Sequence, residues 1–316
     1  MKIAFLLYPT ERLKVNEETS FWMMFELQKR GHTVFAFEDK GLFWAPNAPF
    51  AHLTPMKLDP KKGYLPSKPR NPEPVSLLDL DAIVIRKEPP FDERYLHALQ
   101  LLALVRESVF ILNDPNGIIA ANEKLFILEF PKFIPETLVT EHPDAARAFM
   151  KNLKSRVVVK PLDQKGGRGI FSSSFSDRNF PSLFETITDS GRRKVMLQRF
   201  VSADRHGDKR ILILNGEALG AFIRKPPAHD FRANLSVGAS MHASRLSKRD
   251  HGLINAMREK LSAGGLYLVG IDVIGNYLTE VNVTSPAGIP EINALSGTHP
   301  ERSVADFIES RRRFLK

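Results

Sequence analysis

The twenty residues from Tyr267 to Pro286, YLVGIDVIGNYLTEVNVTSP, constrain the fold of this chain more than any other segment. Two runs rich in Val, Ile, Leu and Tyr flank the turn residues Gly275-Asn276, and this pattern predicts a β-hairpin. Three oxygen-bearing side chains interrupt the apolar runs: Asp272, Glu280 and Asn282. Any fold assigned to this chain must therefore explain why two adjacent strands carry two carboxylates and an amide.

The geometry of the turn decides whether the three side chains share a face. Alternation along a strand places Glu280 and Asn282 on the same side. A two-residue loop would pair Asp272 with Thr279 and send Asp272 to the opposite face, whereas a three-residue loop would pair Asp272 with Glu280. One interpretation is the water-facing side of a half-exposed hairpin. The other is a magnesium site, because neighbouring carboxylates repel unless a cation neutralises them, and an amide adds a third oxygen ligand.

The composition is that of a globular chain of two or three domains, with 316 residues of which 43% are hydrophobic and 26% charged. The opening MKIAFLLYP is too short for a secretion signal, and no apolar run approaches the ~18 residues of a membrane span, so we expect a cytoplasmic protein with no membrane partner. The lack of cysteine excludes disulfides, thiolate metal sites and a cysteine nucleophile. The net charge of +9 suggests an anionic partner; without a helix-turn-helix or RNA-binding motif, we expect small anions and no nucleic acid.

Strands and helices alternate over the first 121 residues. We predict strands over residues 2–8, 33–38, 82–86 and 109–112, and helices over residues 20–30 and 92–107. Thr19 is the predicted N-cap of the first helix, and Gly31 follows its end. The proline-rich residues 41–75 are predicted to be mostly irregular. This order predicts a doubly wound parallel sheet in an α/β domain of residues 1–121.

The pattern changes from residue 122. Residues 122–200 are predicted as a second domain, in which short strands near residues 137, 157, 170 and 195 are interleaved with short helices. Residues 201–316 are predicted as a third, α+β domain. Its predicted elements are a hairpin of residues 210–214 and 217–224 turned by Asn215-Gly216, a helix over residues 247–262, the hairpin of residues 267–286, and a last helix from Pro300.

Residues 157–171, VVVKPLDQKGGRGIF, place a loop with three glycines and two cations between two strands. Glycines allow backbone N–H groups to approach a phosphate, and Lys165 and Arg168 add positive charge. The loop matches neither the Walker pattern nor a GxGxxG motif followed by a helix, so a flexible hairpin loop and a nucleotide lid both remain open. Lys160 ends an apolar strand, where an ammonium group is expected either to meet an anion or to extend to the surface.

Six motifs give the chain a resemblance to a known family: RKEPPFD (residues 86–92), NEKL (122–125), KPLDQKGGRGIF (160–171), GDKRILILNGE (207–217), RANL (232–235) and GIDVIGNYLTEVNVTSP (270–286). Together they resemble the ATP-grasp ligases, and within that superfamily the bacterial glutathione synthetases. The resemblance covers nearly the whole chain. It implies the ATP-grasp fold, with α/β and α+β parts, and an N-terminal doubly wound parallel-sheet domain.

For ATP, the resemblance implies that the catalytic residues Lys160 and Arg210 lie by the phosphates. It also implies that Asp272, Glu280 and Asn282 hold one or two Mg²⁺ ions, for which Mn²⁺ can substitute. The residues implied to bind the nucleotide are Lys124, Lys160, Lys165, Gly166, Gly167, Gly169, Gln198, Arg199, Phe200, Val201, Asp208 and Arg224. Among them, the glycine loop would close over the phosphates and residues 198–201 would line the adenine.

For the substrates, the resemblance implies an acidic peptide, γ-glutamylcysteine, and an amino acid, glycine. ATP would phosphorylate the cysteinyl carboxylate, because phosphate leaves more readily than the carboxylate oxygen, and glycine would open the acyl phosphate to an amide. The residues implied on the substrate side are Arg86, Ser20, Arg232, Asn234, Asn282, Thr284 and Ser285. We also expect a homo-oligomer.

The chain departs from the usual pattern of the family at three places on the substrate side: Asn16-Glu17, residues 238–241 (GASM) and Pro290. Each change removes positive charge, so the ATP and metal sites are better supported than the identity of the peptide. The alternatives are a ligase for another acidic amino acid or peptide, a nucleic-acid-binding protein, and an inactive ATP-binding protein. The inactive protein is disfavoured because the acidic hairpin set is complete.

Overall fold

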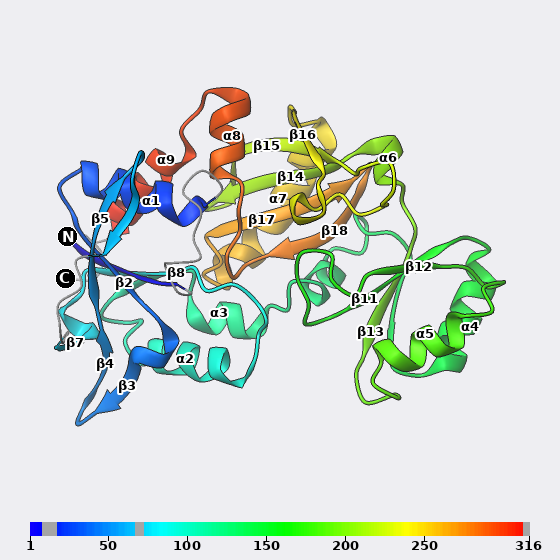
Figure 1. Cartoon of the computed structure of the whole chain (residues 1–316), viewed down its shortest axis with the longest axis horizontal. Helices are drawn as coiled ribbons and strands as arrows, with labels where there is room; N and C mark the ends of the chain where they lie inside the picture. The colour runs from blue at the N-terminus through cyan, green and yellow to red at the C-terminus, as the bar shows by residue number, and fades with distance from the viewer. Residues whose placement is uncertain (8–17, 67–72, 312–316) are drawn as a thin grey trace.

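The computed structural model describes residues 1–7, 18–66 and 73–311 of the chain. Its three larger sheets follow one another along the long axis of the molecule (Figure 1). A six-stranded N-terminal sheet lies at one end, a five-stranded sheet in the middle and a four-stranded sheet at the other end.

The N-terminal sheet has the predicted doubly wound character, with strand order β6-β5-β2-β1-β8-β9 and parallel pairing of β1, β2, β8 and β9. Its strands are β1 (Lys2–Leu6), β2 (Thr33–Phe37), β5 (Thr54–Asp59), β6 (Gly63–Pro66), β8 (Ala82–Ile85) and β9 (Phe110–Leu112). The helices of this part are α1 (Thr19–Lys29), α2 (Glu93–Ala103) and α3 (Pro115–Ala120). Alternate residues of β1 enter two cores, one that contains α1 and one that contains α2, so helices cover both faces.

The prediction that residues 41–75 are irregular was wrong. Strands β3 (Leu42–Ala45), β4 (Ala48–His52) and β7 (Pro74–Ser76) form a small sheet in the order β3-β4-β7, between the short 3₁₀ helices η3 (Asp39–Gly41) and η4 (Leu77–Asp79), and the β5-β6 hairpin extends the main sheet. The prolines of this range that the structure describes fit because they lie near strand ends or where a strand has a partner on one side only. Pro49, for example, pairs with Trp44 of β3, whereas the pairing of β4 with β7 begins at Phe50.

Helix α1 begins one residue earlier than predicted, at Thr19. Its N-cap is Glu18, whose Oε1 accepts the backbone N–H of Ser20 at 3.1 Å. Thr19 is fully buried, and its Oγ1 accepts the N–H groups of Gly288 and Ile289 at 3.1 and 3.2 Å. Thr19 therefore caps a C-terminal helix, a role that depends on tertiary packing.

The four-stranded sheet is antiparallel, with strand order β10-β13-β11-β12. Its strands are β10 (Thr137–Thr140), β11 (Val157–Pro161), β12 (Phe171–Ser173) and β13 (Val195–Arg199). Helices α4 (Pro143–Leu153) and α5 (Phe180–Ile187) share one hydrophobic core with this sheet, and the 3₁₀ helix η5 (Leu125–Glu129) precedes it. The predicted mixture of short strands and short helices is confirmed.

The five-stranded sheet is also antiparallel, with strand order β16-β15-β14-β17-β18. Its strands are β14 (Asp208–Leu214), β15 (Glu217–Lys225), β16 (Ser240–Ala243), β17 (Leu268–Ile274) and β18 (Tyr277–Asn282). The helices of this part are α6 (Ala203–His206), η6 (Leu235–Val237), α7 (Lys248–Ala263), α8 (Ile289–Ser296) and α9 (Pro300–Arg311). Both predicted hairpins and the helix from Pro300 are confirmed, whereas β16 and α8 were not predicted.

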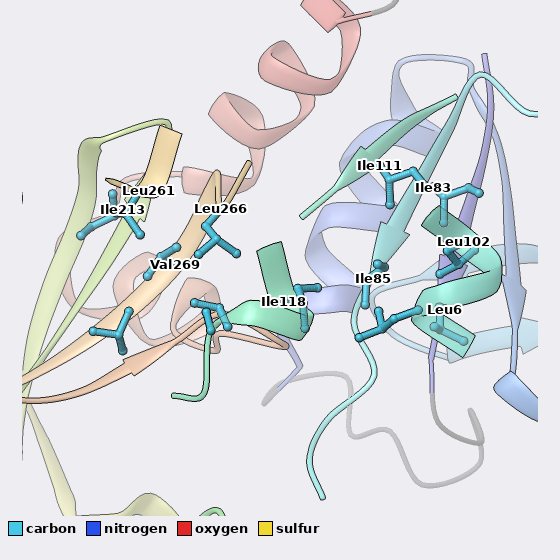
Figure 2. Close-up of a cluster of buried hydrophobic side chains, with 14 of the residues drawn as sticks. Leu6, Ile83, Ile85, Leu102, Ile111, Ile118, Ile213, Leu261, Leu266 and Val269 are labelled. Atoms are coloured by element: carbon cyan, nitrogen blue, oxygen red, sulfur yellow. The ribbon is translucent and has the colours of Figure 1, made fainter. Parts of the chain in front are cut away.

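The N-terminal and five-stranded sheets share a hydrophobic core. Ile118 of α3 lies between side chains of the two sheets, including Ile85 of β8 on one side and Val269 of β17 on the other (Figure 2). Gly117 permits this approach, because a Cβ atom at that position would lie 1.9 Å from the carbonyl oxygen of Gly264.

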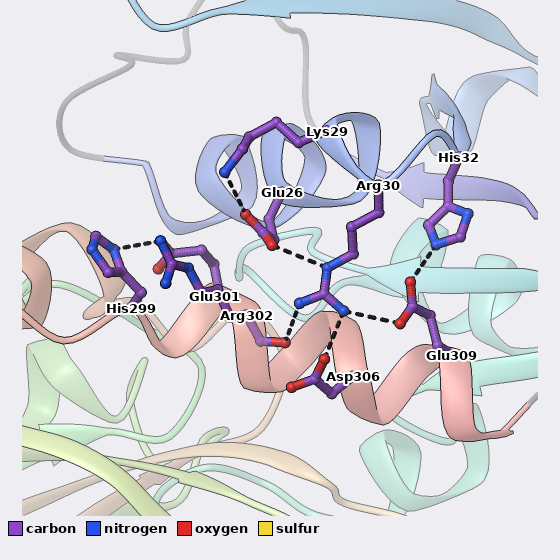
Figure 3. Close-up of polar contacts among 9 residues, drawn as sticks. All are labelled: Glu26, Lys29, Arg30, His32, His299, Glu301, Arg302, Asp306 and Glu309. Carbon is purple, nitrogen blue, oxygen red and sulfur yellow. Dashed lines mark hydrogen bonds and ion pairs between the residues drawn. The ribbon is translucent and has the colours of Figure 1, made fainter.

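The last two helices return to the N-terminal sheet, where α9 lies beside α1 (Figure 1). Arg30 donates to Asp306 at 2.6 Å and to Glu309 at 2.9 Å, and His32 contacts Glu309 at 2.6 Å (Figure 3). Side chains of α8 and α9 belong to the same hydrophobic core as those of β1 and α1. The division into three domains at residues 121 and 200 stays a prediction. Within the described ranges, no helix combines the length and the apolar character that crossing a bilayer requires.

Candidate functional site

A cleft opens between the four-stranded and five-stranded sheets. It is lined by side chains from β11, β13, β14, β17 and β18 and by the loops of residues 164–167 and 231–234. The cleft brings together most of the residues predicted to bind a nucleotide or metal: Lys124, Lys160, Lys165, Gly166, Gly167, Gln198, Arg199, Phe200, Val201, Asp208, Asp272 and Glu280. Two residues predicted for the substrate, Arg232 and Asn234, also line it.

The acidic hairpin achieves its predicted face by an unexpected route. Its turn has two residues, because Ile274 pairs with Tyr277. A register shift follows, so that Asp272 nevertheless pairs with Glu280, and Thr279 is the extra residue of a β-bulge. The Thr279 hydroxyl donates to the carbonyl oxygen of Asp272 at 3.1 Å. The three-residue loop on which a shared face was predicted to depend is not present, but the bulge supplies the same odd residue and keeps both carboxylates on one face.

Asp272 lies at the centre of a buried network of charges on three adjacent strands. Arg210 donates to both of its carboxylate oxygens, at 2.6 and 3.1 Å, and Arg224 approaches it at 2.9 Å. Burial disfavours the charge of Asp272, but the two guanidinium groups outweigh burial and hold its pKa well below the usual range. Arg224 also pairs with Asp208 at 2.6 Å, yet burial raises the pKa of Asp208 to about 6.

The hairpin set offers hard oxygen ligands at the cleft. Glu280 pairs with Lys124 at 3.0 Å, and its side chain keeps 24% of its surface exposed. Asn282 uses its amide nitrogen to contact Gly270 O at 3.2 Å and Asp272 at 3.4 Å, so its carbonyl oxygen is the atom it can offer to a cation. The described residues contain no group of three His, Cys, Asp or Glu placed to hold a metal. Two carboxylates and an amide nonetheless fit a magnesium ion that takes its other ligands from phosphate and water, and this assignment stays a prediction.

Two lysines face the same region from the four-stranded side. Lys160 donates to the side-chain oxygen of Gln198 at 2.6 Å and lies 3.5 Å from the carbonyl oxygen of Thr279. Desolvation at the cleft lowers the pKa of Lys160 to about 8. Lys124 is buried and donates to the carbonyl oxygen of Gln164 at 2.6 Å as well as pairing with the acidic hairpin. Both lysines are therefore placed to meet an anion that enters the cleft.

The segment predicted to line adenine is the end of β13 and the residues that follow. Gln198 is buried and held by Thr137 at 3.0 Å. Arg199 turns toward Glu136, which it contacts at 2.6 Å. Phe200 packs edge-on against Phe231, with ring centroids 6.0 Å apart. This aromatic pair supplies the apolar surface against which a flat base can pack.

The glycine loop lines the cleft, to which it contributes Gly166 and Gly167. Gly166, Gly167 and Gly169 adopt φ values of +63°, +76° and +65°, in the left-handed region that favours glycine. Arg232 donates to the carbonyl oxygen of Gly167 at 3.0 Å, and its guanidinium group also pairs with Asp230 at 2.6 Å. In this arrangement Arg232 contacts the glycine loop, whereas the resemblance implied a substrate carboxylate.

The remaining substrate-side residues lie between the N-terminal and five-stranded sheets. Arg86 is only 1% exposed and donates to Ser20 Oγ at 3.0 Å and to Pro286 O at 2.9 Å. Ser285, which directly precedes Pro286 in the sequence, is half-buried. Thr284 is buried and donates to Glu123 at 2.8 Å. Of the three departures from the family pattern, Asn16-Glu17 lies outside the described residues, residues 238–241 enter β16, and Pro290 lies in the first turn of α8.

Sequence reasoning missed Glu123. Its Oε1 accepts the N–H groups of Val283 and Thr284 at 3.0 and 3.1 Å, and thereby fixes the chain just beyond the acidic hairpin. Burial raises the pKa of Glu123, and the nearby charge of Glu280 adds to the effect. Glu123 lies within the NEKL motif, of which only the neighbouring Lys124 was predicted as a site residue.

The fold and the cleft define an ATP-grasp enzyme, and solved structures share this fold at low identity. The chain is similar to the D-cycloserine synthetase DcsG, with a TM-score of 0.66 and 16% identity over 99% of this chain and 100% of that one. It is similar to the ATP-grasp ligase PsnB, with a TM-score of 0.64 and 15% identity over 98% of both chains.

The family is more specific than the fold. Residues 1–118 match the N-terminal domain of prokaryotic glutathione synthetase, and residues 123–297 match its ATP-grasp domain. Glutathione synthetase of Gloeobacter violaceus is 39% identical, over 98% of this chain and 96% of the relative. That of Nitrosomonas europaea is 38% identical, over 98% of both chains. The chain therefore belongs to the prokaryotic glutathione synthetase family and is an ATP-dependent carboxylate-amine ligase.

Proposed function

We propose that this protein joins γ-glutamylcysteine to glycine with the hydrolysis of ATP to ADP and phosphate. The observation that carries the proposal is the cleft, in which Asp272 and Glu280 share one face beside Lys124 and Lys160. Family membership over nearly the whole chain supports these two substrates.

In the first step, an oxygen of the cysteinyl carboxylate attacks the γ-phosphorus of ATP, and ADP leaves. Two anions must approach each other, so positive charge at the cleft has to offset their repulsion. Lys124 and Lys160, which face the cleft, would supply part of this charge, and Arg210, which pairs with Asp272, would stabilise the transferred group. Asp272, Glu280 and Asn282 would hold a Mg²⁺ ion, which would supply further positive charge for this transfer.

In the second step, the amine of glycine attacks the carbonyl carbon of the acyl phosphate, phosphate leaves, and the new amide nitrogen gives up a proton. The acyl phosphate must be shielded from water until glycine arrives. The glycine loop is suited to this role because it already lies over the cleft and contacts Arg232.

The pocket for the acceptor amine is expected to be the less selective side of the site. Pro290 and residues 238–241 lack the cations expected in the family, and one charge-assisted hydrogen bond to a carboxylate contributes about 1.5 to 3 kcal/mol, or roughly tenfold to a hundredfold in affinity. We therefore expect a higher Michaelis constant for γ-glutamylcysteine than in an enzyme with the full basic set. We also expect partial acceptance of amines other than glycine.

The test is a screen of acids and amines for ADP release, with mass detection of the product. γ-Glutamylcysteine with glycine should give the tripeptide, and alanine, serine and β-alanine should react more slowly. Another acidic amino acid or peptide that reacts faster than γ-glutamylcysteine would move the protein to the alternative ligase reading. Magnesium-dependent ATP binding with no tripeptide from any of these amines would refute the glutathione assignment.

Two further properties belong to the same proposal. We place the reaction in the cytoplasm, because it consumes ATP. We expect a homo-oligomer, which light scattering coupled to size exclusion would reveal as a mass that is a multiple of the 316-residue chain.

A further inference from the structure

Among the described residues, one ion pair joins the glycine loop to the N-terminal part of the protein. Lys165, in the loop of residues 164–169, contacts Glu88. Glu88 follows β8 in the RKEPPFD motif, two residues after Arg86. The pair therefore joins the loop over the nucleotide cleft to the segment that begins with the buried arginine of the substrate side.

The other described contacts of this loop differ in kind. Lys124 donates to the carbonyl oxygen of Gln164 at 2.6 Å, and Arg232 donates to that of Gly167 at 3.0 Å. In both contacts the loop contributes a backbone carbonyl oxygen, which a phosphate does not bind. The pair with Glu88 uses the ammonium group of Lys165. Lys165 also lines the cleft, and its ammonium group is the part of the loop that a phosphate would attract.

We propose that Glu88 is a positioning residue of the nucleotide-free state and that Lys165 exchanges it for a phosphate of the nucleotide. This inference rests on the proposed role of the glycine loop as the nucleotide lid. Glu88 holds the loop over the empty cleft, and a triphosphate, which carries more charge than one carboxylate, takes the lysine away. Nucleotide binding then releases the segment of Glu88 from the lid.

The size of the effect follows from exposure. The side chains of Glu88 and Lys165 are 36% and 40% exposed, so solvent screens their attraction. An exposed pair of this kind changes an equilibrium by about 1.5-fold to 5-fold. In this proposal the Glu88–Lys165 contact exists only without nucleotide. Its loss should therefore weaken the closure of the nucleotide-free loop and strengthen nucleotide binding. Glu88→Gln should open the empty loop more often, and it should bind nucleotide about 1.5-fold to 5-fold more tightly.

This combination separates the proposal from a structural role. If Glu88 merely kept the loop intact, Glu88→Gln would weaken nucleotide binding. If Glu88 competes with phosphate, the same variant binds more tightly although its loop is more open. Glu88→Asp, which keeps the charge, should restore both values toward those of the unmodified protein.

The experiment combines trypsin cleavage at Lys165 or Arg168 with titration of a non-hydrolysable ATP analogue in the presence of magnesium. Faster cleavage of Glu88→Gln without nucleotide, full protection with it, and tighter binding are the expected results. Glu217→Gln is the matched control, because Glu217 makes a surface ion pair with Arg258 at 2.6 Å on another part of the chain, and it should change neither value.

A double-mutant cycle completes the test. Lys165→Ala should weaken analogue binding, and adding Glu88→Gln to it should have no further effect, because the competing partner is already gone. Unchanged cleavage in Glu88→Gln, weaker binding in that variant, or the same effect of Glu88→Gln with and without Lys165 would overturn the proposal. None of these readouts requires ligation, so a failure of the proposed peptide synthesis would be seen separately in the product assay.

Discussion

Asp272→Asn tests the buried charge network and corrects a simple expectation from the sequence. A carboxylate that only held a metal could become an amide with little effect on the fold. In the structure, however, Asp272 accepts from Arg210 at 2.6 and 3.1 Å and lies 2.9 Å from Arg224, and it is 4% exposed. An asparagine would present an NH₂ group to at least one of these donors and would remove the carboxylate charge that both guanidinium groups contact.

Removing one partner of a buried ion pair costs about 3 to 5 kcal/mol, because the remaining charge stays buried without compensation. We expect Asp272→Asn to lower the free energy of unfolding by about that amount in urea denaturation followed by circular dichroism. The depressed pKa of Asp272 gives a stabilisation that is present above the ordinary aspartate range and is lost as the pH falls. The difference between the two proteins should therefore persist from about pH 5 to 8 and shrink only in stronger acid. A loss of less than about 1 kcal/mol at neutral pH would refute this account of the network.

The remaining predictions address the cleft and the packing between sheets. Glu280→Gln should keep the fold, since its carboxylate is partly exposed, yet lose most ADP production; near-normal turnover would contradict the magnesium assignment. Lys160 has a pKa of about 8, which a triphosphate should raise, so nucleotide binding at pH 8 should take up roughly half a proton; calorimetry in two buffers should detect this uptake, and Lys160→Arg should abolish it. Gly117→Ala should prevent stable folding because its Cβ would meet the carbonyl of Gly264 at 1.9 Å, whereas Gly252→Ala, within α7 and with open space around its Cβ, should raise the free energy of unfolding by about 0.5 to 1 kcal/mol in the same denaturation assay.

The predictable parts of the fold are those in which local patterns and tertiary structure agree. The alternation of β17 and β18 and the Asn215-Gly216 turn need only neighbouring residues, so both hairpins followed from the sequence. The bulge at Thr279 did not, because a register shift depends on pairing across strands and leaves the composition of the strand unchanged. Residues 41–75 were misjudged because proline disfavours a strand only where both edges are paired.

The site was predictable in its residue types and less so in their contacts. Asp272 was expected to face a metal, and its arginine partners come from β14 and β15, far away in the sequence. Thr19 was assigned to its own helix because the N-cap preference is local, whereas its hydroxyl serves α8. Arg232 donates to the carbonyl oxygen of Gly167, which lies 65 residues away in the chain. In each case the chemistry of the side chain was clear, and the partner was determined by packing.

The transfer of oxygen from the acid substrate to phosphate tests the central claim most directly. γ-Glutamylcysteine labelled with ¹⁸O in its cysteinyl carboxylate would be incubated with the protein, glycine, ATP and magnesium, and both products would be examined by mass spectrometry. Ligation through an acyl phosphate predicts that each tripeptide keeps one labelled oxygen in its new amide and that each released phosphate carries the other. Tripeptide formation with unlabelled phosphate, or labelled substrate that returns unchanged while ATP is hydrolysed, would contradict the account.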